Sequence, residues 1–244
     1  RAGGARADRS AGVDLVKARA IVALDVPDAV LASALLAQRG PAASFVKVGS
    51  EMFTAAGPPL VARMREERRD VFLDLKWHDI PNTVRNAARA AAKLDVRLVT
   101  VHASGGRAML EAAVEGAGSA CGVLAVTVLT SLVGASLGEA WGRPIAQVED
   151  EVLRLAELAR GAGAHGIVCS GAEAAAVHAK YGSALRLLIP GIRLAGGDAH
   201  DQARVVTPEA AVAAGASYLV LGRAVTAASD PRAALAQVER ALGA

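Results

Sequence analysis

The chain has 244 residues, 53% of them apolar, and its 27 basic and 24 acidic residues give a formal net charge of +3. This mild excess, the lack of a basic block with interleaved aromatics, and only 3% aromatic residues argue against nucleic-acid binding. No apolar run approaches the ~18 residues that a membrane-spanning helix requires. The length and apolar content suffice for one sizeable core, and they suit a single α/β barrel as well as two small domains.

The first residues differ in character from the rest of the chain. Residues 1–17 are rich in alanine, glycine and arginine and lack the apolar core of a signal peptide. We expect a flexible extension over residues 1–17 and one domain over residues 18–244. The two cysteines, Cys121 and Cys169, stand beside apolar runs without a metal-binding spacing, so we expect buried thiols in a reducing compartment.

Eight short aliphatic runs alternate along the chain with alanine-rich segments of helix length. The runs cover residues 20–25, 45–49, 71–76, 97–102, 123–129, 166–170, 187–192 and 218–222. The helical segments cover residues 29–38, 59–68, 82–93, 107–116, 145–161, 173–180, 208–214 and 231–242. Parallel strands that are buried on both faces read as continuous apolar runs. Eight strand–helix pairs predict an α/β fold of the TIM (β/α)8 barrel type, with an open doubly wound sheet as the alternative.

Polar residues follow nearly every predicted strand. They are Asp25, Lys47, Asp74, Lys76, His102, Thr130, Ser170, Arg193 and Arg223. Active sites of such barrels lie at the carboxyl ends of the strands. We therefore expect these residues to meet around one site.

The third run ends in the segment Asp-Leu-Lys-Trp-His-Asp-Ile-Pro-Asn-Thr. Asp74 and Lys76 lie two residues apart in a strand and so share a face. Lys47 stands in an otherwise apolar strand, and a buried lysine needs partners, which Asp74 and Asp79 can supply. We expect an alternating network of lysines and aspartates, with a solvated loop and a surface ion pair as the alternative. Asp25 fits a helix cap equally well when taken alone, but in this company we expect it to bind a ligand hydroxyl.

Glycine and arginine occur together at the ends of the seventh and eighth runs, as Gly191 with Arg193 and Gly222 with Arg223. Barrels often bind phosphate at these two strand ends through backbone N–H groups. Residues 194–204 between them are glycine-rich and polar, which is typical of a mobile lid.

Two familiar motifs do not carry a function here. Residues 161–166 match Gly-x-Gly-x-x-Gly, but a helix precedes and a strand follows, so we interpret them as a helix end and a turn. No Gly-x-Ser-x-Gly elbow is present, which disfavours acyl hydrolysis. His102 ends a strand, where it can line the pocket or satisfy a backbone group.

Together these residues resemble the orotidine 5′-phosphate decarboxylase family over nearly the whole chain. The most specific part is Asp-x-Lys-x-x-Asp-Ile-Pro-Asn-Thr, and Trp77, where phenylalanine is common, is a small departure. The resemblance implies a carbon–carbon lyase of the cytoplasm. It would convert orotidine 5′-phosphate to uridine 5′-phosphate (UMP) and CO2 without cofactor or metal, in the last step of de novo pyrimidine synthesis.

The resemblance also implies a role for each site residue. Lys76 delivers a proton to C6, Asp74 lies near the departing carboxylate, and Lys47 and Asp79 complete the charged array. The implied substrate-binding residues are Asp25, Lys47 and Thr83 for the ribose, Thr130 for the pyrimidine, and Arg193, Gln202, Gly222 and Arg223 for the phosphate, with Gln202 on the closing loop. The family is homodimeric, which implies that Asp79 and Thr83 reach into the partner's site.

Two other functions stay open. Sugar-phosphate decarboxylases and hexulose-phosphate synthases share the Asp-x-Lys-x-x-Asp core but use magnesium, and the Ile-Pro-Asn-Thr continuation with Gln202 and Arg223 fits the nucleotide enzyme better. A barrel that only senses a nucleotide would have no need of Lys76.

Overall fold

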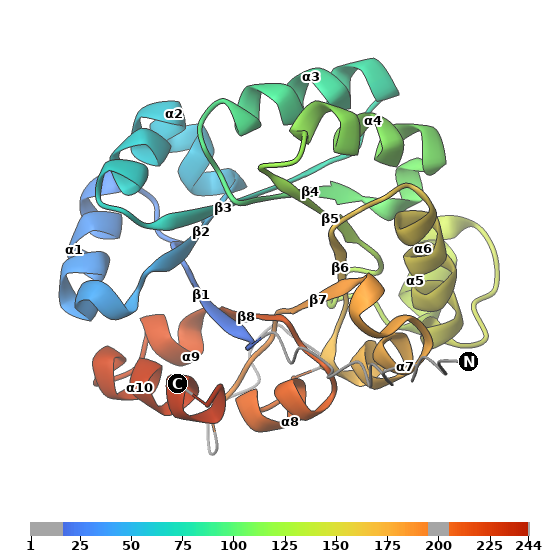
Figure 1. Cartoon of the computed structure of the whole chain (residues 1–244). Helices are drawn as coiled ribbons and strands as arrows, with labels where there is room; N and C mark the ends of the chain where they lie inside the picture. The colour runs from blue at the N-terminus through green and yellow to red at the C-terminus, as the bar shows by residue number, and fades with distance from the viewer. Residues whose placement is uncertain (1–16, 195–204, 244) are drawn as a thin grey trace, which may run out of the picture.

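A computed structural model describes residues 17–194 and 205–243, and its eight strands form a closed parallel barrel in chain order (Figure 1). The strands are β1 (Arg19–Ala23), β2 (Phe45–Gly49), β3 (Asp70–Trp77), β4 (Leu98–His102), β5 (Gly122–Val126), β6 (Gly166–Val168), β7 (Arg186–Ile189) and β8 (Tyr218–Leu221). Pairing of β1 with β8 closes the ring. The predicted TIM barrel is confirmed, and the open-sheet alternative is wrong.

Helices surround the barrel on its outside (Figure 1). They are α1 (Ala29–Arg39), α2 (Ser50–Glu66), α3 (Pro81–Ala92), α4 (Arg107–Ala117), α5 (Gly134–Trp141), α6 (Val148–Gly161), α7 (Gly171–Tyr181), α8 (Pro208–Ala213), α9 (Arg223–Thr226) and α10 (Pro231–Ala241), with 3-10 turns η1 (Gly40–Ala42), η2 (Ala103–Gly105) and η3 (Gly182–Ala184). The sequence did not predict α5, α9 or the first half of α2. Within the described ranges, no helix is both long enough and apolar enough to cross a membrane.

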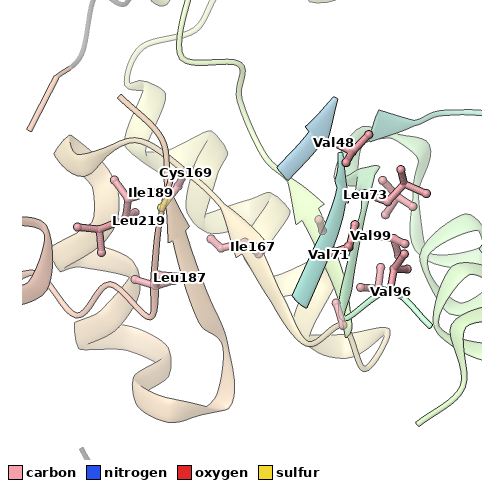
Figure 2. Close-up of a cluster of buried hydrophobic side chains, with 14 of the residues drawn as sticks. Val48, Val71, Leu73, Val96, Val99, Ile167, Cys169, Leu187, Ile189 and Leu219 are labelled. Atoms are coloured by element: carbon pink, nitrogen blue, oxygen red, sulfur yellow. The ribbon is translucent and has the colours of Figure 1, made fainter. Parts of the chain in front are cut away.

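Side chains along each strand alternate between an inner and an outer layer, as the two-residue period of a strand requires. The inner layer is a compact apolar cluster made of Ile21, Ala23, Phe45, Phe72, Leu98, Leu124, Leu188 and Val220. The outer layer packs against the helices, and Figure 2 shows part of it, labelled at Val48, Val71, Leu73, Val96, Val99, Ile167, Cys169, Leu187, Ile189 and Leu219. Lys47 and Asp74 come two residues after Phe45 and Phe72, so their side chains belong to the inner layer. The outer layer can therefore stabilise the barrel without involving them.

Two polar residues that follow strands are helix caps. Asp28 accepts hydrogen bonds from the backbone N–H groups of Val30 and Leu31 at 2.9 and 2.8 Å, so α1 begins there and Asp25 is left for another role. Ser170, expected in the site, instead starts α7 in a capping box with Glu173. That expectation was wrong because the helix needs the Ser170 hydroxyl at its first turn.

Two interpretations away from the site are confirmed. In the Gly-x-Gly-x-x-Gly segment, α6 ends at Gly161, Gly163 has a left-handed φ of 75°, and β6 begins at Gly166. Cys121 and Cys169 are both buried, and no disulfide joins them. Burial raises the pKa of the Cys121 thiol to about 11, which makes it unreactive near neutral pH.

Candidate active site

A cavity of about 450 Å³ opens at the carboxyl ends of the strands. The predicted site residues that line it are Asp25, Lys47, Asp74, Lys76, Thr130, Arg193, Gly222 and Arg223. Apolar inner-layer residues such as Phe72, Leu188 and Val220 also line it. The cavity is therefore charged toward its rim and apolar at its base, the common make-up of a small-molecule site.

Asp25, Lys47, Asp74 and Lys76 form a continuous chain of alternating charge. Lys47 Nζ lies 2.8 Å from Asp25 Oδ1 and 3.7 Å from Asp74 Oδ2, and Lys76 Nζ lies 2.8 Å from the same Asp74 oxygen. The side chains of Lys47 and Asp74 are each 10% exposed, against 38% for Lys76 and 60% for Asp25. The central pair is thus held in a low-dielectric setting, while the Lys76 ammonium still faces the cavity.

Thr100 on β4 is a site residue that sequence reasoning missed. Its hydroxyl donates to Asp74 Oδ1 at 2.9 Å and accepts from the backbone N–H of Lys76 at 2.9 Å. Thr100 is fully buried. A threonine in an aliphatic run reads as an ordinary strand residue, so no signal in the sequence marks it.

The backbone of β3 is irregular where it carries these charges. Between Leu73 and Trp77 its register with β4 shifts, since these residues pair with Val99 and Val101. Lys76 has a φ of 49°, in the left-handed region that non-glycine residues rarely adopt. Such conformations persist only where the surroundings hold them, and they cluster at functional sites.

The ends of β7 and β8 supply the other side of the cavity. Gly191 has a left-handed φ of 75°, which turns the chain toward Arg193. Arg193 is buried, and its backbone N–H donates to the carbonyl of Val206 at 2.9 Å. A Cβ added at Gly222 would meet nothing within 4 Å, so this backbone is open to a ligand, and Arg223 follows at the start of α9. Exposed backbone N–H groups beside guanidinium groups suit a phosphate.

Two predicted site residues, Asp79 and Thr83, do not line the cavity of their own chain. Asp79 is exposed and accepts a hydrogen bond from the N–H of Ile80 at 2.6 Å, so Asp25, and not Asp79, is the fourth member of the charge chain. Thr83 is exposed in the first turn of α3. Gln202 lies outside the described residues, as does most of the predicted lid.

His102 lines a neighbouring hollow of about 220 Å³, not the main cavity. Its ring lies 5.6 Å, centroid to centroid, from that of His78. Burial lowers the pKa of His102, and the charges of His78 and Lys76 lower it further against the opposing effect of Asp74. The imidazole is therefore neutral at neutral pH. Across the described ranges, no three His, Cys, Asp or Glu side chains gather as metal ligands would.

Residues 18–238 match the sequence model of one family, described as "Orotidine 5'-phosphate decarboxylase / HUMPS family". The chain belongs to this family. The orotidine 5′-phosphate decarboxylase of Halorhodospira halophila is 52% identical over 225 residues, which cover 90% of this chain and 94% of that protein. That of Laribacter hongkongensis is 49% identical over 228 residues, covering 92% and 93%. The crystal structure of the Lactobacillus acidophilus orotidine 5′-phosphate decarboxylase matches with a TM-score of 0.82 at 38% identity, covering 92% of this chain and 99% of that one.

Proposed function

We propose that this chain catalyses the decarboxylation of orotidine 5′-phosphate to UMP and CO2 without a cofactor, as a carbon–carbon lyase in the last step of pyrimidine nucleotide synthesis. One observation carries the proposal. The Lys76 ammonium is held 2.8 Å from a buried carboxylate at the wall of a cavity that also presents Thr130 and Arg223. Family membership and relatives at about 50% identity support it.

The reaction breaks the bond between C6 of the pyrimidine and its carboxylate carbon. CO2 leaves, and the bonding electron pair stays on C6. The Lys76 ammonium stabilises this negative charge as it forms and transfers a proton to C6, after which solvent reprotonates the amine. Because the charges are already in place, little reorganisation is needed as the bond breaks.

Asp74 has two tasks in this proposal. It holds Lys76 through Oδ2, and we assign it a place beside the carboxylate of the bound substrate. Repulsion between the two carboxylates would raise the energy of the bound substrate relative to the transition state, because this repulsion is relieved as CO2 departs. The Lys47 ammonium, 3.7 Å from Asp74, partly compensates the charge of this buried carboxylate.

Substrate binding is assigned around the rim. Asp25 and Lys47 bind ribose hydroxyls, Thr130 binds the pyrimidine, and Arg193, Gly222 and Arg223 bind the phosphate. This assignment is supported by their shared place on the cavity wall. Gln202 would add a phosphate contact, and its position outside the described residues leaves that contact a prediction. Phosphate contacts remote from the reacting bond supply binding energy that closes the site.

A homodimer is part of the proposal. Asp79 and Thr83 are exposed and lie away from their own cavity, and the apolar side chain of Ile80 between them is 66% exposed. Residues that complete the ribose site of a partner subunit must project outward in this way. We also place the enzyme in the cytoplasm, where pyrimidine nucleotides are made.

Ultraviolet absorbance of orotidine 5′-phosphate during turnover tests the proposal. The wild type should consume it equally well with and without EDTA, and Lys76→Ala should lose roughly 10³-fold or more in kcat. Lys180→Ala, an exposed lysine on α7, is the matched control and should keep full activity. Loss of activity in EDTA would instead favour a magnesium-dependent sugar-phosphate enzyme, and UMP binding without turnover would favour a sensor.

A further inference from the structure

The hydroxyl of Thr100 joins the two groups that the proposed reaction depends on most. It donates a hydrogen bond to Asp74 Oδ1 and accepts one from the backbone N–H of Lys76, both at 2.9 Å. Thr100 is fully buried, so water does not compete for either bond. Hydrogen bonds to a buried carboxylate are stronger than those between neutral groups.

The bond to Asp74 determines which oxygen faces the ammonium groups. Oδ1 accepts the Thr100 hydrogen bond, and Oδ2 lies 3.7 Å from Lys47 Nζ and 2.8 Å from Lys76 Nζ. A carboxylate held at one oxygen cannot rotate freely about its χ2 torsion. The Lys76 ammonium is therefore held at a definite place relative to the cavity.

The bond to Lys76 compensates for the irregular backbone of β3. The register shift between Leu73 and Trp77 and the left-handed φ of Lys76 take its N–H out of the regular ladder with β4. A buried backbone N–H without a partner is costly, and the Thr100 hydroxyl supplies the partner. One side chain thus stabilises both the backbone that aims Lys76 and the carboxylate that holds its ammonium.

We propose that Thr100 is a positioning residue that sets the Asp74–Lys76 geometry for proton delivery; this inference rests on the proposed decarboxylase function. Thr100 is not one of the residues that line the cavity, so we expect it to act through Asp74 and Lys76. Its loss should therefore act on the chemical step and not on substrate binding. A residue that only filled space in β4 would affect folding stability and leave kcat alone.

Three variants test this. Thr100→Val keeps the shape and removes the hydroxyl, and Thr100→Ser keeps the hydroxyl. Thr127→Val is the matched control, because Thr127 is also buried and donates its hydroxyl to the carbonyl of Val168 at 2.8 Å, away from Asp74 and Lys76. We expect Thr100→Val to lower kcat by roughly 10- to 100-fold with KM changed by less than about threefold. Thr100→Ser should recover to within a few-fold of wild type, and Thr127→Val should keep the wild-type kcat.

Two further measurements do not depend on turnover. Affinity for UMP, which lacks the carboxylate, should be unchanged in Thr100→Val and shows that the variant is folded. Exchange of the Lys76 amide hydrogen should be at least about tenfold faster in Thr100→Val and near wild type in Thr100→Ser. If Thr100→Val does not fold, Thr100→Ala beside Thr100→Ser makes the same comparison.

The outcomes separate the two proposals. A wild type without decarboxylase activity would refute the proposed function, while the exchange of the Lys76 amide would still report on the Thr100 contact. An active wild type with unchanged kcat in Thr100→Val would refute the positioning role. So would an equal loss of kcat in Thr127→Val, because the effect would then be that of any lost buried hydroxyl.

Discussion

Neutralising Asp74 should lower the free energy of unfolding as well as the rate of turnover. Asp74→Asn keeps the side chain's shape and removes the charge that faces Lys76 at 2.8 Å and Lys47 at 3.7 Å. At an effective dielectric constant of about 20, these pairs correspond to upper limits of about 6 and about 4.5 kcal/mol. Solvent screening of the 38%-exposed Lys76 and the remaining pair between Lys47 and Asp25 reduce the loss. We expect the free energy of unfolding to fall by about 2–4 kcal/mol.

Urea denaturation at neutral pH measures this loss, and Asp25→Asn is the matched control. Asp25 contacts the same Lys47 at 2.8 Å, but its side chain is 60% exposed, so its neutralisation should cost only about 0–1 kcal/mol. Equal losses in the two variants would refute the view that burial decides the strength of these pairs. Turnover of Asp74→Asn is the second readout. If this variant kept full activity, repulsion of the substrate carboxylate by Asp74 would be refuted.

Three further predictions concern stability. Burial of Glu151 favours a higher pKa, but hydrogen bonds from two arginines outweigh this effect and lower its pKa. The contribution of Glu151 to the free energy of unfolding is therefore present at neutral pH and is lost as the pH falls below 4.5. Glu151→Gln should cost about 1–2 kcal/mol at pH 7 in urea denaturation and little at acidic pH. Burial chiefly lowers the pKa of His102, so the folded state should lose stability as the pH falls from 6.5 through that lowered pKa, and His102→Gln should flatten this part of a melting-temperature profile. A Cβ at Gly116 of α4 would lie 2.2 Å from the carbonyl oxygen of Arg85 on α3, so Gly116→Ala should lower the unfolding free energy by about 1–3 kcal/mol.

Each of these has a result that would contradict it. Glu151→Gln must lose its deficit on acidification; a constant deficit would mean that packing, not charge, is responsible. An unchanged acid slope in His102→Gln would place the titration on another group. For Gly116, the control is Gly134→Ala, where the nearest atom would be 3.8 Å away; if both substitutions cost the same, close helix contact is not the cause.

Much of the fold was predictable because the strands are short and aliphatic and alternate with helical segments, and each predicted run overlaps a strand of the barrel. The missed helices have weak local signals. α5 contains Gly134 and Gly138, α9 has only four residues, and the kink at Gly57 with the prolines after it hides the first half of α2. In each case tertiary packing, and not local propensity, determines the helix.

The candidate site was predictable where charge breaks an apolar pattern. Lys47 and Asp74 stood out for that reason, and the two-residue period placed them on the inner face. The choice between a cap and a site role for Asp25 required the structure, because Asp28 three residues later can cap the same helix. Thr100 was not predictable, since its contact with Lys76 depends on how β3 shifts against β4.

The alternating chain of Asp25, Lys47, Asp74 and Lys76 contains two ammonium and two carboxylate groups, so its formal charges cancel. An approaching anion is therefore not drawn in by the groups that would act on it. In the proposed function, the substrate phosphate is bound by Arg193 and Arg223, beyond the ends of β7 and β8, and β7 lies across the ring from β3 in Figure 1. In the proposed function, the phosphate contacts and the reacting groups are therefore separate sets of charges, and a substitution in one set leaves the charge balance of the other unchanged.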